Sequence, residues 1–172
     1  MFFTTRLIFV TASILSLGNA CASLTHHVPF TEADYLPYLE AGTGVITGEA
    51  LVMLKGGEVR KGAEDMVFLI PATPYTKEWF SQRVVGEKII EGGDPRALRA
   101  TRSTTTDRLG RFTFTNLPPG DYFLTCEITW DVPSINVRSL EVKRGIRSVL
   151  AYGRASVGDG ETVRVQVTRP EQ

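Results

Sequence analysis

The segment from Thr104 to Leu124, TTTDRLGRFTFTNLPPGDYFL, constrains the fold of this chain more than any other. It combines two alternating apolar patterns with two turn signals, at residues 107–110 and 118–120. Successive side chains of a strand point to opposite faces, so Phe112 and Phe114 share one face. The segment predicts neighbouring strands of a β-sandwich and not an active site.

A second strand follows the second turn and continues to Trp130. We expect one of its two rows of alternate residues to face the core, because a period of two is typical of a sheet with one buried face. The inward row consists of Tyr122, Leu124, Cys126, Ile128 and Trp130, and the outward row of Phe123, Thr125, Glu127 and Thr129. Cys126 is therefore expected to be a small buried hydrophobic residue.

Strand patterns also occur on both sides of this segment. The stretch GVITGEALVML begins at Gly44 and contains Gly48, which predicts a bulge or a close approach of backbones. The apolar run 66–70 fits a central strand covered on both faces. Further strands are expected at residues 101–106, 149–152 and 163–168. The total of about seven strands, with no long helical pattern, predicts an all-β sandwich.

Residues 72–103 are the least regular part of the chain. Thr76 is a candidate cap for a short helix through Trp79 and Phe80, and residues 92–95 carry a strong turn signal. We expect this region to form a short irregular or helical insertion.

The N-terminal residues have the composition of a secretory signal peptide. Arg6 precedes the mostly apolar run 7–17, which is too short for a membrane span of about twenty residues. Cys21 follows the small residue Ala20, and this position resembles a bacterial lipobox, although Gly18 stands where leucine is usual. The resemblance implies lipid attachment at Cys21 and, without a following aspartate, an outer membrane lipoprotein. The alternative is ordinary cleavage after Ala20 or Ala22, which would leave a periplasmic or secreted protein.

The expected organisation is a signal peptide at 1–20, a tether at 21–43, a sandwich at 44–168 and a tail at 169–172. The tether contains several large apolar residues that could dock it on the sandwich. A Cys21–Cys126 disulfide is an alternative in an oxidising compartment, and lipidation would exclude it.

The charge and composition argue against a nucleic-acid-binding protein. The formal net charge is +0, and loss of Arg6 with the signal peptide would leave 18 basic against 19 acidic residues. No cluster of lysine and arginine with interleaved aromatic residues occurs, so no nucleic acid partner is expected.

The stretches GVITGEA at 44–50 and TDRLGRFTFTNLPPGDYFL at 106–124 resemble the carboxypeptidase regulatory-like domains. That resemblance covers roughly residues 44–168 and implies an Ig-like, transthyretin-like sandwich. In that family the matching glycine, proline, leucine and aromatic residues build the core and the turns. The resemblance therefore implies a fold and no catalytic group, and related domains are also grouped with carbohydrate-binding-like sandwiches.

The sequence offers few candidates for chemistry. His26 and His27 are the only histidines, and adjacent residues of an extended segment point in opposite directions, which disfavours a shared metal. Three aspartates near turns could bind calcium, but aspartate is also a common turn residue, and we favour that role: Asp107, Asp121 and Asp131. No cofactor, no metal and no enzymatic activity are expected.

Tyr75, Trp79 and Phe80 are the candidate binding residues. Exposed aromatic side chains could stack on sugar rings or fill a partner's pocket, because they offer a large apolar area with few rotatable bonds. The alternative is that they cap one end of the sandwich. We expect a non-enzymatic, lipid-anchored envelope module for protein contact or structural support, or alternatively a carbohydrate-binding module. Its expected partners are an envelope protein or glycan, and the membrane if Cys21 is modified.

Overall fold

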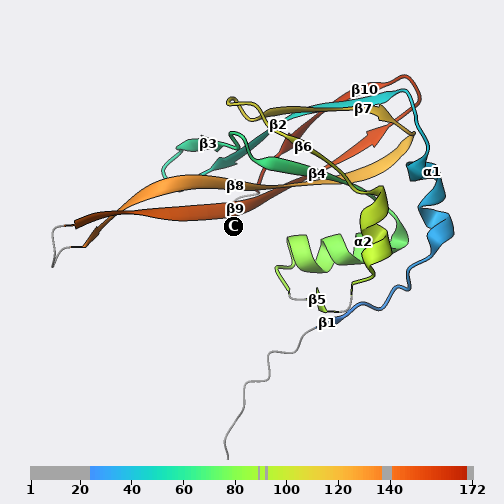
Figure 1. Cartoon of the computed structure of the whole chain (residues 1–172), viewed down its shortest axis with the longest axis horizontal. Coiled ribbons are helices and arrows are strands. Elements are labelled where there is room, and N and C mark those ends of the chain that lie inside the picture. The colour runs from blue at the N-terminus through green and yellow to red at the C-terminus, as the bar shows by residue number, and fades with distance from the viewer. Residues whose placement is uncertain (1–23, 89, 92, 137–140, 170–172) are drawn as a thin grey trace, which may run out of the picture.

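Two four-stranded sheets face each other in the computed structural model, which describes residues 24–88, 90–91, 93–136 and 141–169 (Figure 1). The first sheet is formed by β2 (Gly44–Met53), β3 (Val59–Lys61), β7 (Arg111–Leu117) and β10 (Thr162–Val167). The second has the order β6 (Arg102–Thr105), β4 (Met66–Pro71), β8 (Gly120–Asn136) and β9 (Glu141–Val157). The all-β sandwich is confirmed, and β3 is the strand of these two sheets that the sequence analysis did not anticipate.

The central strand of the first sheet is β2. It pairs antiparallel with β7 and β3 on one side and parallel with β10 on the other. Gly48 confirms the expected close approach, because a Cβ atom at this position would lie 2.4 Å from both the Phe112 ring and the Val165 carbonyl oxygen. The glycine allows the three strands to pack at this distance.

The core between the sheets contains the apolar row of β8, as the alternation predicted. Leu124, Cys126 and Ile128 have no exposed surface. Burial raises the pKa of the free Cys126 thiol to about 12. The other cysteine, Cys21, and the expected signal peptide lie outside the described residues.

The turn that precedes β7 is held by its aspartate. The Asp107 carboxylate accepts hydrogen bonds from the backbone N–H groups of Leu109 (2.8 Å) and Arg111 (2.9 Å), and Gly110 has a φ of 78°. At the next turn the buried Tyr122 hydroxyl donates to the Pro118 carbonyl oxygen at 2.8 Å. Within the described ranges no group of three or more potential ligand residues could hold a metal ion.

Residues between β4 and β6 form a helical insertion. It consists of α2 (Pro74–Trp79), a π-helical turn (Phe80–Val85), β5 (Ile90–Glu91) and a 3-10 helix (Pro95–Ala100). The expected cap at Thr76 is wrong: Thr73 caps α2, and its side chain accepts a hydrogen bond from the Thr76 N–H at 3.2 Å. The helix begins earlier because Pro74 suits its first position, where no N–H donor is needed.

The insertion covers one end of the outer face of the second sheet. Phe80 stacks on Phe123 with ring centroids 4.0 Å apart, and Phe123 and Thr125 are buried although they belong to the outward row of β8. The expectation that β4 is covered on both faces holds only at this end, since Met66 and Phe68 are 51% and 41% exposed.

Strands β8 and β9 form a hairpin that projects beyond the other strands (Figure 1). Each strand has 17 residues. Both are much longer than expected, because the first predicted strand ends at Trp130 and the second begins at Val149. We call the described outer part of the hairpin, residues 131–136 and 141–148, the arm. Ile146 on the arm is 78% exposed.

The described part of the expected tether, residues 24–43, packs on the sandwich and its insertion. It contains β1 (Leu24–Thr25), a 3-10 helix (Glu32–Asp34) and α1 (Leu36–Leu39), and β1 pairs parallel with β5. Tyr35 is buried, and Tyr38 packs edge-on against Tyr122 with a centroid distance of 5.3 Å. No helix among the described residues is long and apolar enough to span a membrane.

Candidate binding site

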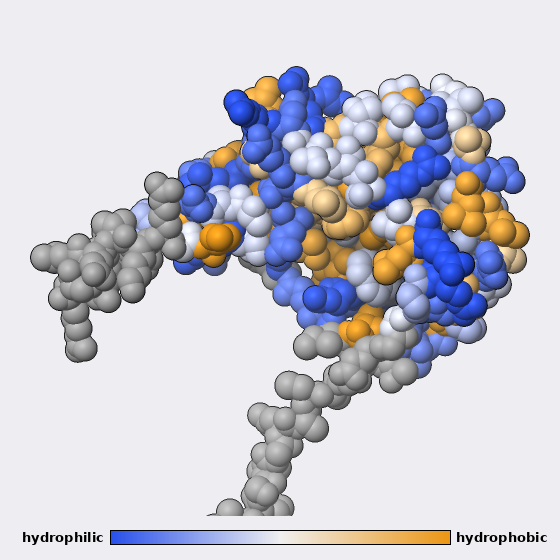
Figure 2. Space-filling view, viewed as in Figure 1, coloured by the Kyte–Doolittle hydropathy of each residue, from blue (hydrophilic) through white to orange (hydrophobic). Residues whose placement is uncertain are grey.

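A groove lies between the helical insertion and the outer face of the second sheet. Its volume is about 440 Å³, within the usual size range of small-molecule sites. Figure 2 shows hydrophobic residues gathered in a hollow on this side of the molecule. The lining residues come from β4, α2, the 3-10 helix and β8, and include Phe68, Ile70, Tyr75, Trp79, Leu98 and Thr125.

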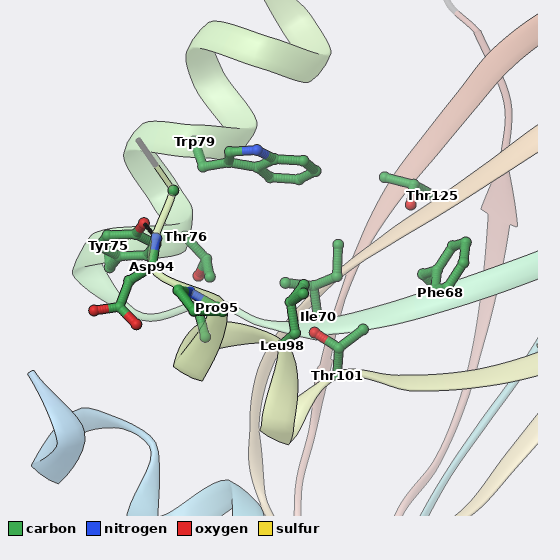
Figure 3. Close-up of a pocket in the computed structure, with 12 residues that line it drawn as sticks. Phe68, Ile70, Tyr75, Thr76, Trp79, Asp94, Pro95, Leu98, Thr101 and Thr125 are labelled. Carbon is green, nitrogen blue, oxygen red and sulfur yellow. Dashed lines mark hydrogen bonds between the residues drawn. The ribbon is translucent and has the colours of Figure 1, made fainter. Parts of the chain in front are cut away.

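Trp79 is the candidate residue best placed to contact a ligand in this groove. It is half-buried at the end of α2, and its indole extends across the groove above Ile70 and Leu98 (Figure 3). Leu98, on the 3-10 helix of the opposite wall, is 70% exposed. The indole ring and Leu98 thus form two apolar sides of an open slot.

Tyr75 and Phe80 have different positions from Trp79. Tyr75 also lines the groove, but it is only 6% exposed, and its hydroxyl oxygen accepts a hydrogen bond from the Asp94 N–H at 2.5 Å. Phe80 is fully buried between the insertion and the sheet, so its side chain is not exposed as the binding hypothesis required. Its role in the described structure is to pack α2 on the sheet.

The groove carries little free charge. Asp94 is its single charged lining residue among those described, and its carboxylate accepts hydrogen bonds from the Arg96 N–H (2.9 Å), Nε and Nη2. These contacts with Arg96 lower the pKa of Asp94. Among the described lining residues, the hydroxyls of Thr101 and Thr125 and the indole N–H of Trp79 make no side-chain hydrogen bond.

A second hollow lies on the other side of α2 and differs in charge. It has a volume of about 420 Å³ and is lined in part by Lys77, Arg154 and Asp121. The Arg154 guanidinium lies over the Phe123 ring, 5.3 Å from its centre. This hollow provides a cationic surface close to the neutral groove.

Sequence reasoning did not identify Phe68, Leu98, Thr101 or Thr125 as groove residues. Leu98 and Thr101 gave no signal, because isolated aliphatic and hydroxyl side chains are common on protein surfaces. The exposed Phe68 belonged to a run that predicts a buried strand. The insertion brings these residues together only in the folded chain.

Comparisons with known proteins support the fold. No protein-family model matches the chain, and no curated protein matches it. A solved structure from Pseudomonas aeruginosa, described as a candidate carbohydrate-binding protein, is similar, with 28% identity and a TM-score of 0.65 over 81% of this chain and 97% of that protein. A minor pilin of Streptococcus agalactiae matches at 13% identity with a TM-score of 0.37, over 77% of this chain and 47% of the pilin, a likeness too weak to carry an argument. The carboxypeptidase regulatory-like assignment therefore stays a prediction.

Proposed function

We propose that this protein is a non-enzymatic binding module whose groove takes an uncharged segment of a glycan. The observation that carries the proposal is Trp79, whose half-buried indole extends over an apolar groove. Sugar rings have apolar faces that stack on aromatic rings, and their hydroxyl groups could hydrogen bond to Thr101 and Thr125. The description of the similar Pseudomonas aeruginosa protein supports the same ligand class.

The charge of the groove favours a neutral ligand. An acidic sugar would bring a carboxylate into an apolar site where the Asp94 carboxylate is already present and engaged by Arg96. A charge taken out of water without a partner is costly. Binding of neutral oligosaccharides in preference to acidic ones is therefore expected.

Calorimetric titration of the exported chain with neutral and acidic oligosaccharides tests this function. Trp79→Ala should weaken binding about 30-fold, because a central aromatic contact contributes about 2 kcal/mol. Trp79→Phe should retain part of the affinity, since it keeps an aromatic face. Leu109→Ala, which changes a half-exposed residue outside the groove, is the matched control.

The same titration has outcomes against the proposal. Equal affinities of Trp79→Ala and the wild type would remove Trp79 from the binding site. A preference for acidic oligosaccharides that is lost in Lys77→Ala would assign binding to the cationic hollow instead. No binding to any envelope glycan would favour protein contact or structural support, for which the projecting arm with its exposed Ile146 is the best surface.

We also propose that the chain is exported and anchored through a lipid on Cys21, which would place the groove at the outer membrane. The intact mass and the N-terminal peptide of the membrane-bound protein should then show diacylglycerol on Cys21 and a mature chain that begins there. Cys21→Ser should be found in the soluble fraction. An unmodified N-terminus would overturn the anchor and leave a periplasmic or secreted binding module.

A further inference from the structure

The leader, which we define as residues 24–40, contacts both helical walls of the groove, which are α2 and the 3-10 helix Pro95–Ala100. The His26 ring stacks on the Tyr75 ring of α2 with a centroid distance of 3.8 Å and an interplanar angle of 8°. Phe30 packs edge-on against Tyr75 at 6.0 Å, and the Arg96 guanidinium of the 3-10 helix lies 4.4 Å from the centre of the Phe30 ring. Phe30 therefore links the two walls.

The leader and the two walls also share one small core. Tyr35 of the leader is 2% exposed and forms a buried cluster with Tyr75, Ala97 and Ala100. Its hydroxyl accepts a hydrogen bond from the Thr73 hydroxyl at 3.1 Å. Because Tyr75 also accepts from the Asp94 N–H, a displacement of the leader would disturb the contacts that hold the walls together.

Glu78 holds the leader against α2. Its carboxylate oxygens accept hydrogen bonds from the N–H groups of His27 (3.1 Å) and Val28 (2.7 Å), and one lies 2.9 Å from His27 Nδ1. The Nδ1 atom of His26 is also 2.9 Å from this carboxylate but is not aligned for a hydrogen bond, and neither nitrogen of the His26 ring has a hydrogen-bond partner among the described residues. The expectation that the two histidines point apart is thus wrong, since both rings approach one carboxylate.

We propose that the docked leader sets the separation of the groove walls, and that Glu78 is the positioning residue that keeps it docked. Glu78 directly precedes Trp79, and Tyr75 lies one helical turn before Trp79 on α2, so the leader contacts the element that presents the indole. The dependence of ligand affinity on docking rests on the proposed function. By linkage, a ligand in the groove should in turn favour the docked leader.

Hydrogen exchange of the exported chain tests this inference without a ligand. Glu78→Gln keeps the shape of the side chain but removes its charge. Faster exchange is expected at residues 26–28, which contact Glu78, and also at 94–97, which do not contact it. In Phe30→Ala, exchange at 94–97 should rise by a similar factor, because the link between the walls is lost. Glu49→Gln, which breaks an ion pair with Lys61 in the first sheet, should leave both segments unchanged.

Two results would overturn the inference. The first is a leader that exchanges rapidly in Glu78→Gln while residues 94–97 keep their wild-type protection. The second is an unchanged leader in this variant, because the charge of Glu78 would then not hold it.

Acid should release the leader through the same carboxylate. The N–H of Val28 is the largest cause that lowers the pKa of Glu78 from 4.5 to about 2, followed in the same direction by the contacts with His27 and His26, while burial opposes them. The docking energy from this group is therefore complete above pH 4.5 and is lost as the pH falls towards 2. The protection factor at 26–28, which is the exchange rate of an unstructured peptide at the same pH divided by that of the protein, should fall over this interval in the wild type and be independent of pH in Glu78→Gln, which leaves His26 and His27 in place. Equal pH profiles would contradict the assignment to Glu78.

Ligand titration separates this inference from the proposed function. In a protein that binds neutral glycan, Glu78→Gln should weaken affinity by about 5-fold or more, the lower range of coupling between sites. Unchanged affinity with a released leader would overturn the coupling and leave the proposed function intact. Absence of glycan binding in the wild type would remove the proposed function, and the exchange measurement would still decide whether the leader positions the walls.

Discussion

Phe80→Ala is expected to lower the free energy of unfolding by about 3–5 kcal/mol, as is typical when a buried phenylalanine is truncated. Phe80 has no exposed surface, stacks on Phe123 at 4.0 Å, and meets Tyr152 edge-on at 5.6 Å. Its removal would leave a cavity between the insertion and the second sheet. Urea denaturation of the wild type and the variant, followed by circular dichroism, measures the difference.

Phe68→Ala is the matched control for this prediction. Phe68 lies on the same face of the sheet but is 41% exposed, so much less burial is lost and a clearly smaller decrease is expected. Similar losses in the two variants would contradict the packing role of Phe80. If Phe80→Ala also binds ligand less tightly, the cause is indirect, because the Phe80 ring itself is not exposed in the groove.

Gly48→Ala is expected to destabilise the sandwich by up to about 3 kcal/mol, the upper range for overpacking a core. The new methyl group would lie 2.4 Å from the Val165 carbonyl oxygen, so the backbones of β2 and β10 would have to separate. The effect is steric, because Gly48 does not have a positive φ. Thermal or urea denaturation gives the magnitude.

Gly145→Ala provides the comparison, because it makes the same substitution in another strand. The nearest atom to a Cβ at Gly145 is Val132 Cγ2 at 3.4 Å, which is an ordinary contact. Its effect should lie within about 0.5 kcal/mol of the wild type. If the two glycine variants were equally stable, close packing at Gly48 would not be the cause.

The sandwich could be predicted because its strands carry local patterns. In β2, β7 and β8, one row of side chains meets the opposite sheet, and that burial imposes a period of two on the sequence. The turn at Asp107 is equally local, since the aspartate bonds to backbone groups two and four residues away. Such features need no knowledge of the rest of the fold.

The arm could not be predicted in this way. Its strands pair mainly with each other and extend beyond the core, so burial does not impose an apolar period there. Pro133 and Gly145 further weaken the strand pattern. The β9 edge of the arm also carries Lys143, Arg144 and Arg147 in the sequence, and such residues discourage pairing with other strands.

The candidate site was predicted only in part, because its geometry depends on the residue at which one short helix begins, which decides which side chains face the groove. With α2 beginning after Thr73, Tyr75 and Trp79 lie four residues apart on one side, and Phe80 turns towards the sheet. The composition of the segment identified all three aromatic residues but could not distinguish their burial. Contacts such as Glu78 with the leader join residues 50 apart in sequence, and no local pattern announces them.

The docked leader has a mechanical consequence if the upstream chain is held at a surface. Tension from that side would act first on the two residue pairs of β1 with β5 and on the hydrogen bonds to Glu78. These contacts are far fewer than the residue pairs between β8 and β9, so the leader would detach before the sandwich opens. Pulling on the N-terminus would lengthen the protein by the span of the leader, while the folded sheets stay intact.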